Sequence, residues 1–190
     1  MRTKDDKKQE ALFQATIKVV NEIGFAASSV SKIAKEAKIS PATLYIYYRN
    51  KEDLLVSTYI EIKKSIGEEL SQVVDHELPL RDCLLNLWKK IFSHISNNKE
   101  EFRFAEQFSN SPYTQLVDKE ELNNSFSSVI AVLQRGIDMK IIKNVDFNIL
   151  AAFIFHPITT LANPNLCSDF ELNEETLEQA FQLAWDAIKL

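Results

Sequence analysis

Three tyrosines stand within four positions of the sequence, and two basic residues follow them. The stretch ISPATLYIYYRNK over residues 39–51 contains Tyr45, Tyr47 and Tyr48, then Arg49 and Lys51. A phenol donates a hydrogen bond from its hydroxyl while its ring packs against apolar surface, and Lys and Arg carry a positive charge. These groups suit the anionic oxygens and the sugars of a phosphate backbone. The chemistry that this stretch favours is therefore the binding of a polyanion.

The charge of the chain supports a polyanion partner for its first quarter alone. Residues 1–51 contain ten Lys/Arg and five Asp/Glu, a net charge of +5. Residues 52–190 contain twelve Lys/Arg and twenty-two Asp/Glu, a net charge of −10. A basic segment on an acidic body indicates that only the basic segment meets the polyanion.

Other kinds of chemistry find little support in the sequence. It has no glycine-rich phosphate loop, no paired-carboxylate motif and no Ser/His or Cys/His arrangement at a recognisable spacing, so we expect no enzyme. Cys83 and Cys167 lie far apart without metal-ligand spacing, and we expect reduced thiols, no metal and no cofactor. No uncharged apolar run reaches 18 residues, and the N-terminal MRTKDDKKQE lacks a signal-peptide core. We therefore expect no membrane segment and a cytoplasmic location.

The elements that must position the tyrosines are short helices. Gly24 ends a first amphipathic helix, Ser28 and Ser29 offer an N-cap for a second, and Ser40 caps a third, with Pro41 at its first position. A three-residue turn, Lys38-Ile39-Ser40, joins the second helix to the third. The predicted helices cover about residues 5–23, 29–37 and 41–47.

The remainder of the chain also predicts helices and no strands. Glycine and proline are scarce, at 3 and 5 residues, and apolar residues recur at helical spacing. Six further helices are predicted, over about residues 51–75, 79–97, 99–109, 115–139, 146–162 and 174–189. We therefore predict an all-α fold of about nine helices. An N-terminal domain of residues 1–51 is joined through the long fourth helix to a C-terminal domain of residues 52–190.

The second and third helices have the pattern of a helix-turn-helix. Small residues at Ala34 and Ala37 let these helices approach closely, so that the third helix protrudes far enough to enter a major groove. Its exposed side is predicted to carry Ser40, Pro41, Ala42, Thr43, Tyr45 and Tyr47. Tyr47 and Lys51 are the preferred phosphate contacts. Tyr48, one step round the helix, is predicted to pack inward instead.

Residues 24–55 resemble the N-terminal signature of TetR-family transcriptional regulators. The resemblance covers about residues 10–56, and its matching positions are Gly24, Phe25, Ser28, Ser29, Val30, Ile33, Ala34, Ala37, Ser40, Thr43, Leu44, Tyr45, Tyr47, Tyr48, Lys51 and Leu54. It implies an all-helical homodimer that binds a double-stranded DNA operator and usually represses transcription. The C-terminal domain would then bind a small-molecule effector.

The resemblance also implies roles for particular residues. Phosphate contacts fall to Ser28 or Ser29, Thr43, Tyr47 and Lys51, and base contacts to Ser40, Pro41, Ala42, Thr43 and Tyr45. Lys38 stands where the family commonly has glycine, so it must adopt a left-handed conformation or the turn must adjust, and we expect it to add a phosphate contact. The third helix has no Arg, Asn or Gln. Specificity should then come from hydroxyls, contacts with thymine methyl groups and DNA shape.

The C-terminal part is rich in aromatic residues that suit a small-molecule pocket, although a plain core is the alternative for any one of them. By resemblance some of this set lines a pocket for a hydrophobic or aromatic effector. The candidates are Trp88, Phe92, Phe104, Phe108, Phe126, Ile130 and Phe155.

The last two predicted helices are too apolar to bury only one face. We expect a second copy of the chain to cover part of them, and in the family these helices form a four-helix dimer interface. The candidates are Phe147, Leu150, Ile154, Leu177, Phe181, Ala184, Trp185 and Ile188. A two-fold dimer places two recognition helices about one DNA turn apart, which suits a palindromic operator.

One rival function stays open from the sequence. A soluble helical small-molecule-binding protein with a vestigial DNA-binding domain would have a similar composition. It would require a decayed recognition helix, whereas Thr43, Tyr47 and Lys51 are all present.

Overall fold

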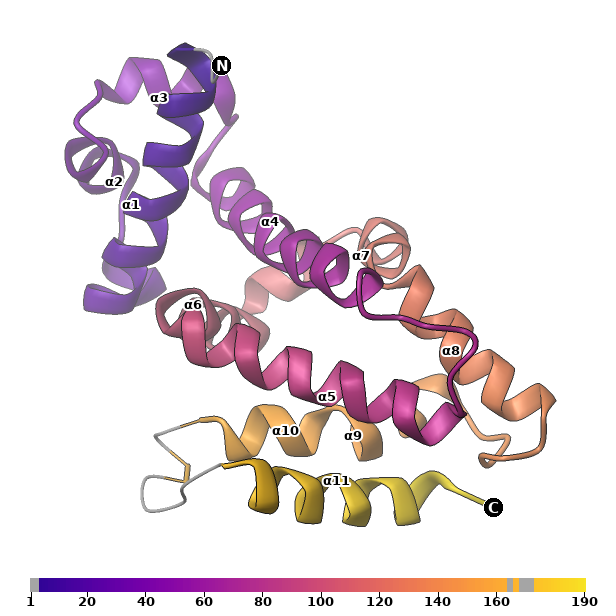
Figure 1. The fold of residues 1–190 in the computed structure, drawn as a ribbon. Coiled ribbons are helices and arrows are strands. Elements are labelled where there is room, and N and C mark those ends of the chain that lie inside the picture. The colour runs from indigo at the N-terminus through magenta and orange to yellow at the C-terminus, as the bar shows by residue number, and fades with distance from the viewer. Residues whose placement is uncertain (1–3, 164–165, 168–172) are drawn as a thin grey trace. The chain divides into compact units, whose positions relative to one another are not determined.

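The computed structural model describes residues 4–163, 166–167 and 173–190, and within these ranges it is helical, with one isolated β-bridge and no strand (Figure 1). This confirms the predicted all-α class. The elements are α1 (Lys4–Ala27), α2 (Val30–Glu36), α3 (Pro41–Tyr47), α4 (Lys51–Ser71), α5 (Leu80–Asn97), α6 (Lys99–Ser109), the 3-10 helix η1 (Pro112–Leu116), α7 (Lys119–Ser125), α8 (Ser127–Asp138), α9 (Phe147–Ile154), α10 (His156–Leu161) and α11 (Glu174–Ile188).

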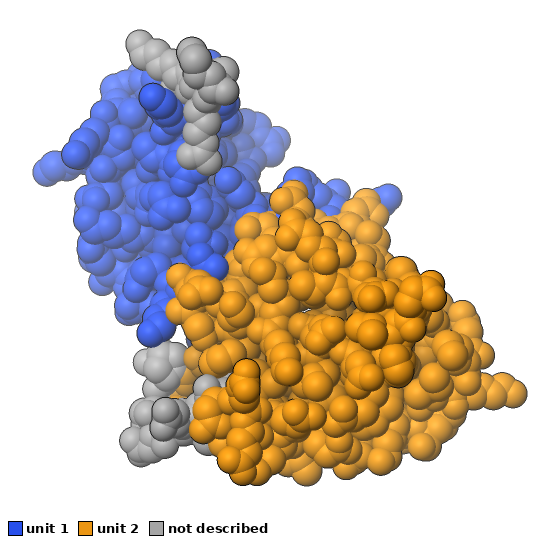
Figure 2. Space-filling view, viewed as in Figure 1, with its two compact units in different colours: residues 1–64, 98–122 blue, residues 65–97, 123–190 orange. Residues whose placement is uncertain are grey.

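The chain packs as two compact units (Figure 2). Unit 1 contains residues 1–64 and 98–122, and unit 2 contains residues 65–97 and 123–190. Helix α6, which belongs to the predicted C-terminal domain, therefore packs in the same unit as the N-terminal helices. The division of function between residues 1–51 and 52–190 stays a prediction.

The N-terminal helices form around a small apolar core in unit 1. Its buried members are Leu12, Ala15, Val19, Ile33, Ala34, Leu44 and Leu54. Gly24, with φ 75° and ψ 166°, interrupts the helical backbone of α1 where the sequence predicted its end, and a further helical turn follows to Ala27. A Cβ at Gly24 would meet no atom within 4 Å, so the glycine is required by its left-handed φ and not by crowding.

Side-chain caps and a left-handed residue shape the helix-turn-helix. The side chain of Ser29 accepts from the Lys32 N–H at the start of α2, and Ser40 caps α3 in the same way, ahead of Pro41. Lys38 has φ 57°, which settles how a non-glycine residue fits this turn: it adopts the left-handed conformation. The bounds of α3 agree with the predicted residues 41–47.

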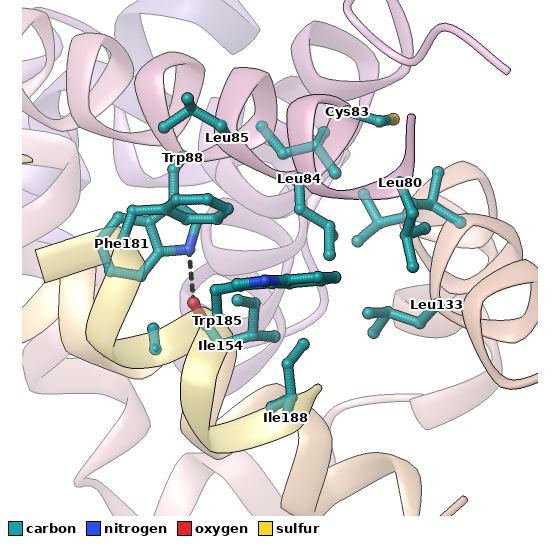
Figure 3. Packing of buried hydrophobic residues seen from close by; sticks show 14 of the residues in the cluster. Leu80, Cys83, Leu84, Leu85, Trp88, Leu133, Ile154, Phe181, Trp185 and Ile188 are labelled. Atoms are coloured by element: carbon teal, nitrogen blue, oxygen red, sulfur yellow. Dashed lines mark hydrogen bonds between the residues drawn. The ribbon is translucent and has the colours of Figure 1, made fainter. Parts of the chain in front are cut away.

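Unit 2 is built on α5, α9, α10 and α11, which lie side by side in Figure 1. Trp88 fills the centre of its core, where the ring packs edge-on against Phe181 at a centroid distance of 5.4 Å. The Trp88 indole donates to the carbonyl of Ile154 at 2.6 Å (Figure 3). The predicted helix 146–162 is divided at Phe155 into α9 and α10, because Pro157 has no N–H for the helical ladder.

The predicted helix over residues 115–139 is also divided, into η1, α7 and α8. Phe126 between α7 and α8 has φ −110° and ψ 17°, outside the helical region. At this point α4 approaches closely, and a Cβ added to Gly67 would lie 2.1 Å from the Ser125 carbonyl oxygen. The division therefore coincides with a close crossing of two backbones in unit 2.

Neither a membrane span nor a metal cluster is found in the part of the chain that the structure describes. There, no helix combines the length and apolar character needed to cross a bilayer. The same residues contain no group of three or more His, Cys, Asp or Glu placed to hold a metal ion.

Candidate nucleic-acid interface

The buried side chain of Leu44 anchors helix α3 and so determines which face of the helix is exposed to solvent. Leu44 is completely buried in the core of unit 1. The opposite face carries Ala42 and Ile46, and Tyr45 lies beside them. The side chains of Tyr45 and Ile46 are 55% and 76% exposed. Because Leu44 faces the core, the side of α3 that carries Ala42, Tyr45 and Ile46 faces solvent.

Hydroxyl groups gather at the N-terminal end of α3. The Ser40 hydroxyl accepts from the Thr43 N–H at 3.1 Å and shares a 2.9 Å hydrogen bond with the Thr43 hydroxyl. Pro41 and Ala42 between them are exposed. The structure therefore brings together the predicted base-contacting residues Ser40, Pro41, Ala42, Thr43 and Tyr45 on one end and face of a single helix.

The two tyrosines that end this stretch both pack against the core of unit 1. Tyr48 does so as predicted, and Tyr47 shares that packing. The Tyr47 hydroxyl donates to the Asp5 carboxylate at 2.9 Å. Partial burial raises the pKa of the Tyr47 phenol, and the Asp5 carboxylate raises that pKa further, so the hydroxyl stays protonated at neutral pH. The Tyr47 hydroxyl is therefore a hydrogen-bond donor at neutral pH, and its present acceptor is the Asp5 carboxylate of the same chain.

Lys51 is also engaged within unit 1. Its ammonium donates to the backbone carbonyl of Phe25 at 2.5 Å. The Phe25 ring in turn packs at centroid distances of 5.6 Å from Phe104 and 6.0 Å from Phe108, both on α6. Phe25 therefore connects Lys51, a predicted phosphate contact, to α6: its backbone carbonyl accepts from Lys51 and its ring packs against the α6 phenylalanines.

The remaining predicted phosphate contacts differ in accessibility. Ser28 is buried and donates its hydroxyl to the Phe25 carbonyl at 2.8 Å, whereas Ser29 is only half-buried. Of these two alternatives, Ser29 is the accessible one. Lys38 is exposed, and so is Lys35 on the last turn of α2. The charges of these two lysines lie at the turn that leads into α3.

Two residues of this surface received no role from the sequence, although one of them, Arg49, stands in the basic stretch that first indicated a polyanion partner. Among the described residues of unit 1, Ile46 is the most exposed large apolar side chain, and its spacing of four from Ala42, opposite Leu44, would have identified it. Arg49 is exposed and pairs with Asp53, with Nη2 2.9 Å from Oδ1. The Arg49 side chain, followed by its backbone N–H, lowers the pKa of the Asp53 carboxyl.

The predicted pocket residues are divided between the two units. Phe104 and Phe108 are buried in unit 1, where Phe108 stacks on Tyr59 at 4.3 Å. The other five lie in unit 2. Trp88 is part of the core of that unit, and Phe92, Phe126 and Phe155 pack against this core. Ile130 is half-buried. The assignment of an effector pocket to this set stays a prediction.

Seven of the eight predicted dimer residues are buried in the core of unit 2, and Phe147 alone is exposed. The exposed apolar face of the same helices carries Ile149, Phe153 and Leu183, the last 74% exposed. A shallow groove on this face is lined by Ala152, Phe153, His156, Pro157, Thr160, Leu161, Ala180, Leu183, Ala184 and Ala187. We call these residues the α9–α11 groove, and it shares Ala184 with the predicted set.

This geometry defines the class of helix-turn-helix DNA-binding proteins. A turn of four residues, 37–40, joins α2 to α3, one residue more than predicted because α2 ends at Glu36, and Ser40 caps α3. Helix α3 is buried on one side at Leu44 and exposed to solvent on the other, as a helix that enters a DNA groove must be.

Comparison with known families identifies the family within this class. Residues 12–58 match the bacterial regulatory proteins of the tetR family, and residues 79–189 match the tetracyclin repressor-like C-terminal domain. The chain belongs to the TetR family of transcriptional regulators. The predicted class of DNA-binding regulator is thereby confirmed.

Relatives extend over almost the whole chain. An uncharacterized HTH-type transcriptional regulator of Haemophilus influenzae is 24% identical over 180 residues, 95% of each chain. The crystal structure of a TetR family transcription regulator from Marinobacter aquaeolei superposes with a TM-score of 0.88 at 35% identity, over 100% of this chain and 99% of that one. The transcriptional regulator FadR of Bacillus subtilis, in complex with stearoyl-CoA, superposes with a TM-score of 0.76 at 22% identity, over 94% and 98% of the two chains.

Proposed function

We propose that the protein is a repressor that binds a palindromic operator as a homodimer and leaves it when a small hydrophobic effector binds. The observation that carries this proposal is the free face of α3, held outward by the buried Leu44. This function requires only the binding of DNA and of an effector, so we propose no catalytic activity. A regulator of chromosomal transcription in bacteria works in the cytoplasm, where we place it.

On the DNA, Ser29, Thr43, Tyr47 and Lys51 contact phosphates in this proposal, and Lys38 adds charge at the turn. Hydroxyls and ammonium groups are suited to phosphate oxygens and fix the register of α3 in the major groove. Tyr47 and Lys51 are held by Asp5 and by the Phe25 carbonyl, so each must share or exchange its partner when the operator binds.

A second copy of the chain is the occupant that we propose for the α9–α11 groove. Four alanines line it, so helices of two copies can approach closely, and Leu183 and Phe153 supply apolar side chains to bury. A two-fold axis at this face presents the same surface twice, which matches a self-complementary interface and a palindromic operator.

An apolar effector is supported by a relative and by the aromatic content of the chain. A protein of similar fold binds stearoyl-CoA, and a fatty acid metabolism regulator protein of Bacillus subtilis is 31% identical over 87 residues, 46% of this chain. We propose a long-chain acyl group as the first effector class to test. The predicted aromatic candidates on α5, α6 and α8–α10 are the residues to probe for its pocket.

Contacts inside unit 1 provide a route from α6 to the DNA-binding helices. The Asn21 amide donates to the Glu100 carbonyl at 2.9 Å, and the Gln107 amide donates to Asn21 at 3.0 Å. The Phe25 ring packs against Phe104 on α6, and the Phe25 backbone carbonyl accepts a hydrogen bond from Lys51. An effector that favours another position of α6 would therefore change the position of α1 and of Lys51. It does so only through different affinity for the two states.

The test is a gel-shift titration with the intergenic DNA upstream of the gene. Wild type is compared with Tyr47→Phe, Lys51→Ala and, as a matched control, Lys89→Ala, which changes an exposed lysine on α5 in unit 2. We expect tight wild-type binding that Tyr47→Phe and Lys51→Ala weaken and Lys89→Ala leaves unchanged. Equal affinity for all four proteins would contradict the assigned phosphate contacts.

A second titration adds a long-chain acyl-CoA to the preformed complex, with coenzyme A alone as the control. Release by the acyl-CoA only would support an apolar effector. If every acyl chain length and a set of aromatic acids leave the operator affinity unchanged at saturation, the effector part of the proposal fails while DNA binding stands.

A further inference from the structure

The outward face of α3 is apolar at its centre. Leu44 is fully buried, and Ala42 and Ile46, spaced by four residues, lie on the opposite side of the helix. The Ile46 side chain is 76% exposed to solvent. An isoleucine with a free face on a helix that enters DNA is available for contact with an apolar group of the DNA.

Apart from the hydroxyl of the exposed Tyr45, the polar groups of the same helix offer little for hydrogen bonding to base edges. From Pro41 to Tyr47 the helix has no Arg, Lys, Asn, Gln, Asp or Glu. The Ser40 and Thr43 hydroxyls are hydrogen-bonded to each other at 2.9 Å, and the Tyr47 hydroxyl is bonded to Asp5. Bidentate contacts to guanine or adenine need side chains that α3 lacks.

Among the four bases, thymine alone presents a methyl group in the major groove. We propose that Ile46 recognises the 5-methyl group of thymine, with Ala42 completing the same apolar surface. This inference rests on the proposed function, and it names what each operator half-site contains: an A·T pair whose thymine methyl lies beneath Ile46. Ile46 is then a specificity-determining residue that hydrogen-bond chemistry alone would not reveal.

The size of the effect follows from the area that one methyl group buries. Burying a single methyl or methylene is worth about fourfold in an equilibrium constant. Removing the thymine methyl from both half-sites should therefore weaken binding roughly fifteenfold. The loss should be nearly the same at low and high salt, because no charge is involved, whereas phosphate contacts depend strongly on salt.

The experiment begins with a duplex selected from a random-sequence pool by the full-length wild-type protein. Each thymine of that duplex is then replaced by deoxyuridine, symmetrically in both half-sites, which removes only the 5-methyl group. The Kd is measured by fluorescence anisotropy for wild type, Ile46→Ala and a matched control, Ile23→Ala. Ile23 is an isoleucine of the same unit that is 42% exposed on α1.

We expect one thymine position at which deoxyuridine weakens wild type and Ile23→Ala roughly fifteenfold and Ile46→Ala hardly at all. The double-mutant comparison cancels any effect of deoxyuridine on the DNA itself, because that effect is common to all three proteins. Ile46 faces solvent, and alanine favours helix, so the variant should fold; its circular dichroism spectrum checks this.

Two outcomes would overturn the inference while leaving the proposed function intact. In the first, wild type binds the selected duplex and no deoxyuridine position weakens it. In the second, the deoxyuridine loss persists unchanged in Ile46→Ala, which assigns the methyl contact to another residue. If wild type selects no duplex at all, the proposed function itself fails and the inference fails with it.

Discussion

At the scale of single residues, Tyr47 and Asp5 form a contact that should weaken DNA binding. The Asp5 carboxylate accepts the Tyr47 hydroxyl at 2.9 Å, and it would compete for that hydroxyl with the phosphate oxygen of the proposed contact. We expect Asp5→Asn to raise operator affinity several-fold, because it removes both a competing anion and a charge that repels phosphate. Anisotropy titration against the selected duplex measures the change.

The control for Asp5 is its neighbour Asp6, in the first turn of the same helix. Asp6→Asn removes the same charge without touching Tyr47, and it should give a smaller gain. An equal gain from both variants, or an undiminished gain when Asp5→Asn is combined with Tyr47→Phe, would show that the contact with Tyr47 is irrelevant.

Residue spacing could predict where the side chains of α3 point, but not what they contact inside the protein. The period of the helix places Leu44 inside and Ala42 outside. It does not reveal that Tyr47 bonds to a carboxylate 42 positions earlier, or that Lys51 bonds to a carbonyl 26 positions earlier. Such partners depend on how α1 packs across the unit.

At the scale of elements, Gly67 marks where α4 crosses the end of α7. A Cβ there would lie 2.1 Å from the Ser125 carbonyl oxygen, a backbone atom that cannot swing aside. We expect Gly67→Ala to lower the free energy of unfolding by roughly 1–3 kcal/mol, although alanine favours helix by about 1 kcal/mol in an open site.

Urea unfolding measures this loss, and Ser65→Ala on the same helix is the matched control because Ser65 is exposed. Ser65→Ala should change the free energy of unfolding by no more than about 0.5 kcal/mol. A Gly67→Ala protein as stable as wild type would mean that the two backbones do not meet as described.

A buried histidine joins α4 to α5 through a carboxylate. Glu69 accepts from His94 Nδ1 at 3.1 Å and from the Lys90 ammonium at 2.9 Å. Burial alone would raise the pKa of Glu69, but the hydrogen bonds from Lys90 and His94 outweigh it and the net shift is downward. Ionised Glu69 therefore stabilises the fold above its unfolded pKa, near 4.5, and this stability is lost as the pH falls through the lower folded pKa.

Replacing Glu69 by Gln should therefore reduce the loss of stability between about pH 5 and pH 3. Chemical unfolding at a series of pH values gives the slope of the free energy of unfolding against pH for wild type and for Glu69→Gln. The same slope in wild type and Glu69→Gln would exclude Glu69 from the acid sensitivity of the protein.

Helix boundaries were predictable where capping residues fix them and were missed where packing decides. Ser40 with Pro41 gave α3 its start, and Asn98 preceded α6 at the predicted position. The break at Phe126 has no such local signal, because it coincides with the crossing at Gly67, a residue about sixty positions earlier. Pro157 is a local signal for the other break, because it cannot donate to the helical ladder, and the predicted helix 146–162 is divided there into α9 and α10.

At the scale of the whole molecule, the α9–α11 groove should decide whether two DNA-binding units act together. Leu183 lines it and is 74% exposed. We expect Leu183→Glu to give a monomer and to weaken operator binding strongly, because a charge would be buried at the interface and the second half-site contact would be lost. Analytical ultracentrifugation gives the mass.

Leu116→Glu is the matched control, since Leu116 is an exposed leucine of unit 1. It should leave the mass unchanged. A Leu183→Glu protein that sediments as a dimer with unchanged operator affinity would place the interface elsewhere.

The class of the protein was predictable from the sequence because a basic N-terminal quarter and a capped helix-turn-helix are local features. The dimer residues show what such patterns leave open. An apolar helix pattern identified Leu177, Phe181 and Trp185, and all three are buried in unit 2. Periodicity shows that a face is apolar, but it does not show whether the chain itself or a second copy covers that face.

The most direct test of DNA binding through phosphate contacts is the operator affinity as a function of salt. We expect the logarithm of the association constant to fall linearly with the logarithm of salt concentration, with a loss of order 10³ or more between about 50 and 200 mM. Lys51→Ala should reduce that slope by about one unit. An affinity that does not change with salt, or a slope that Lys51→Ala leaves unaltered, would contradict the proposed binding mode.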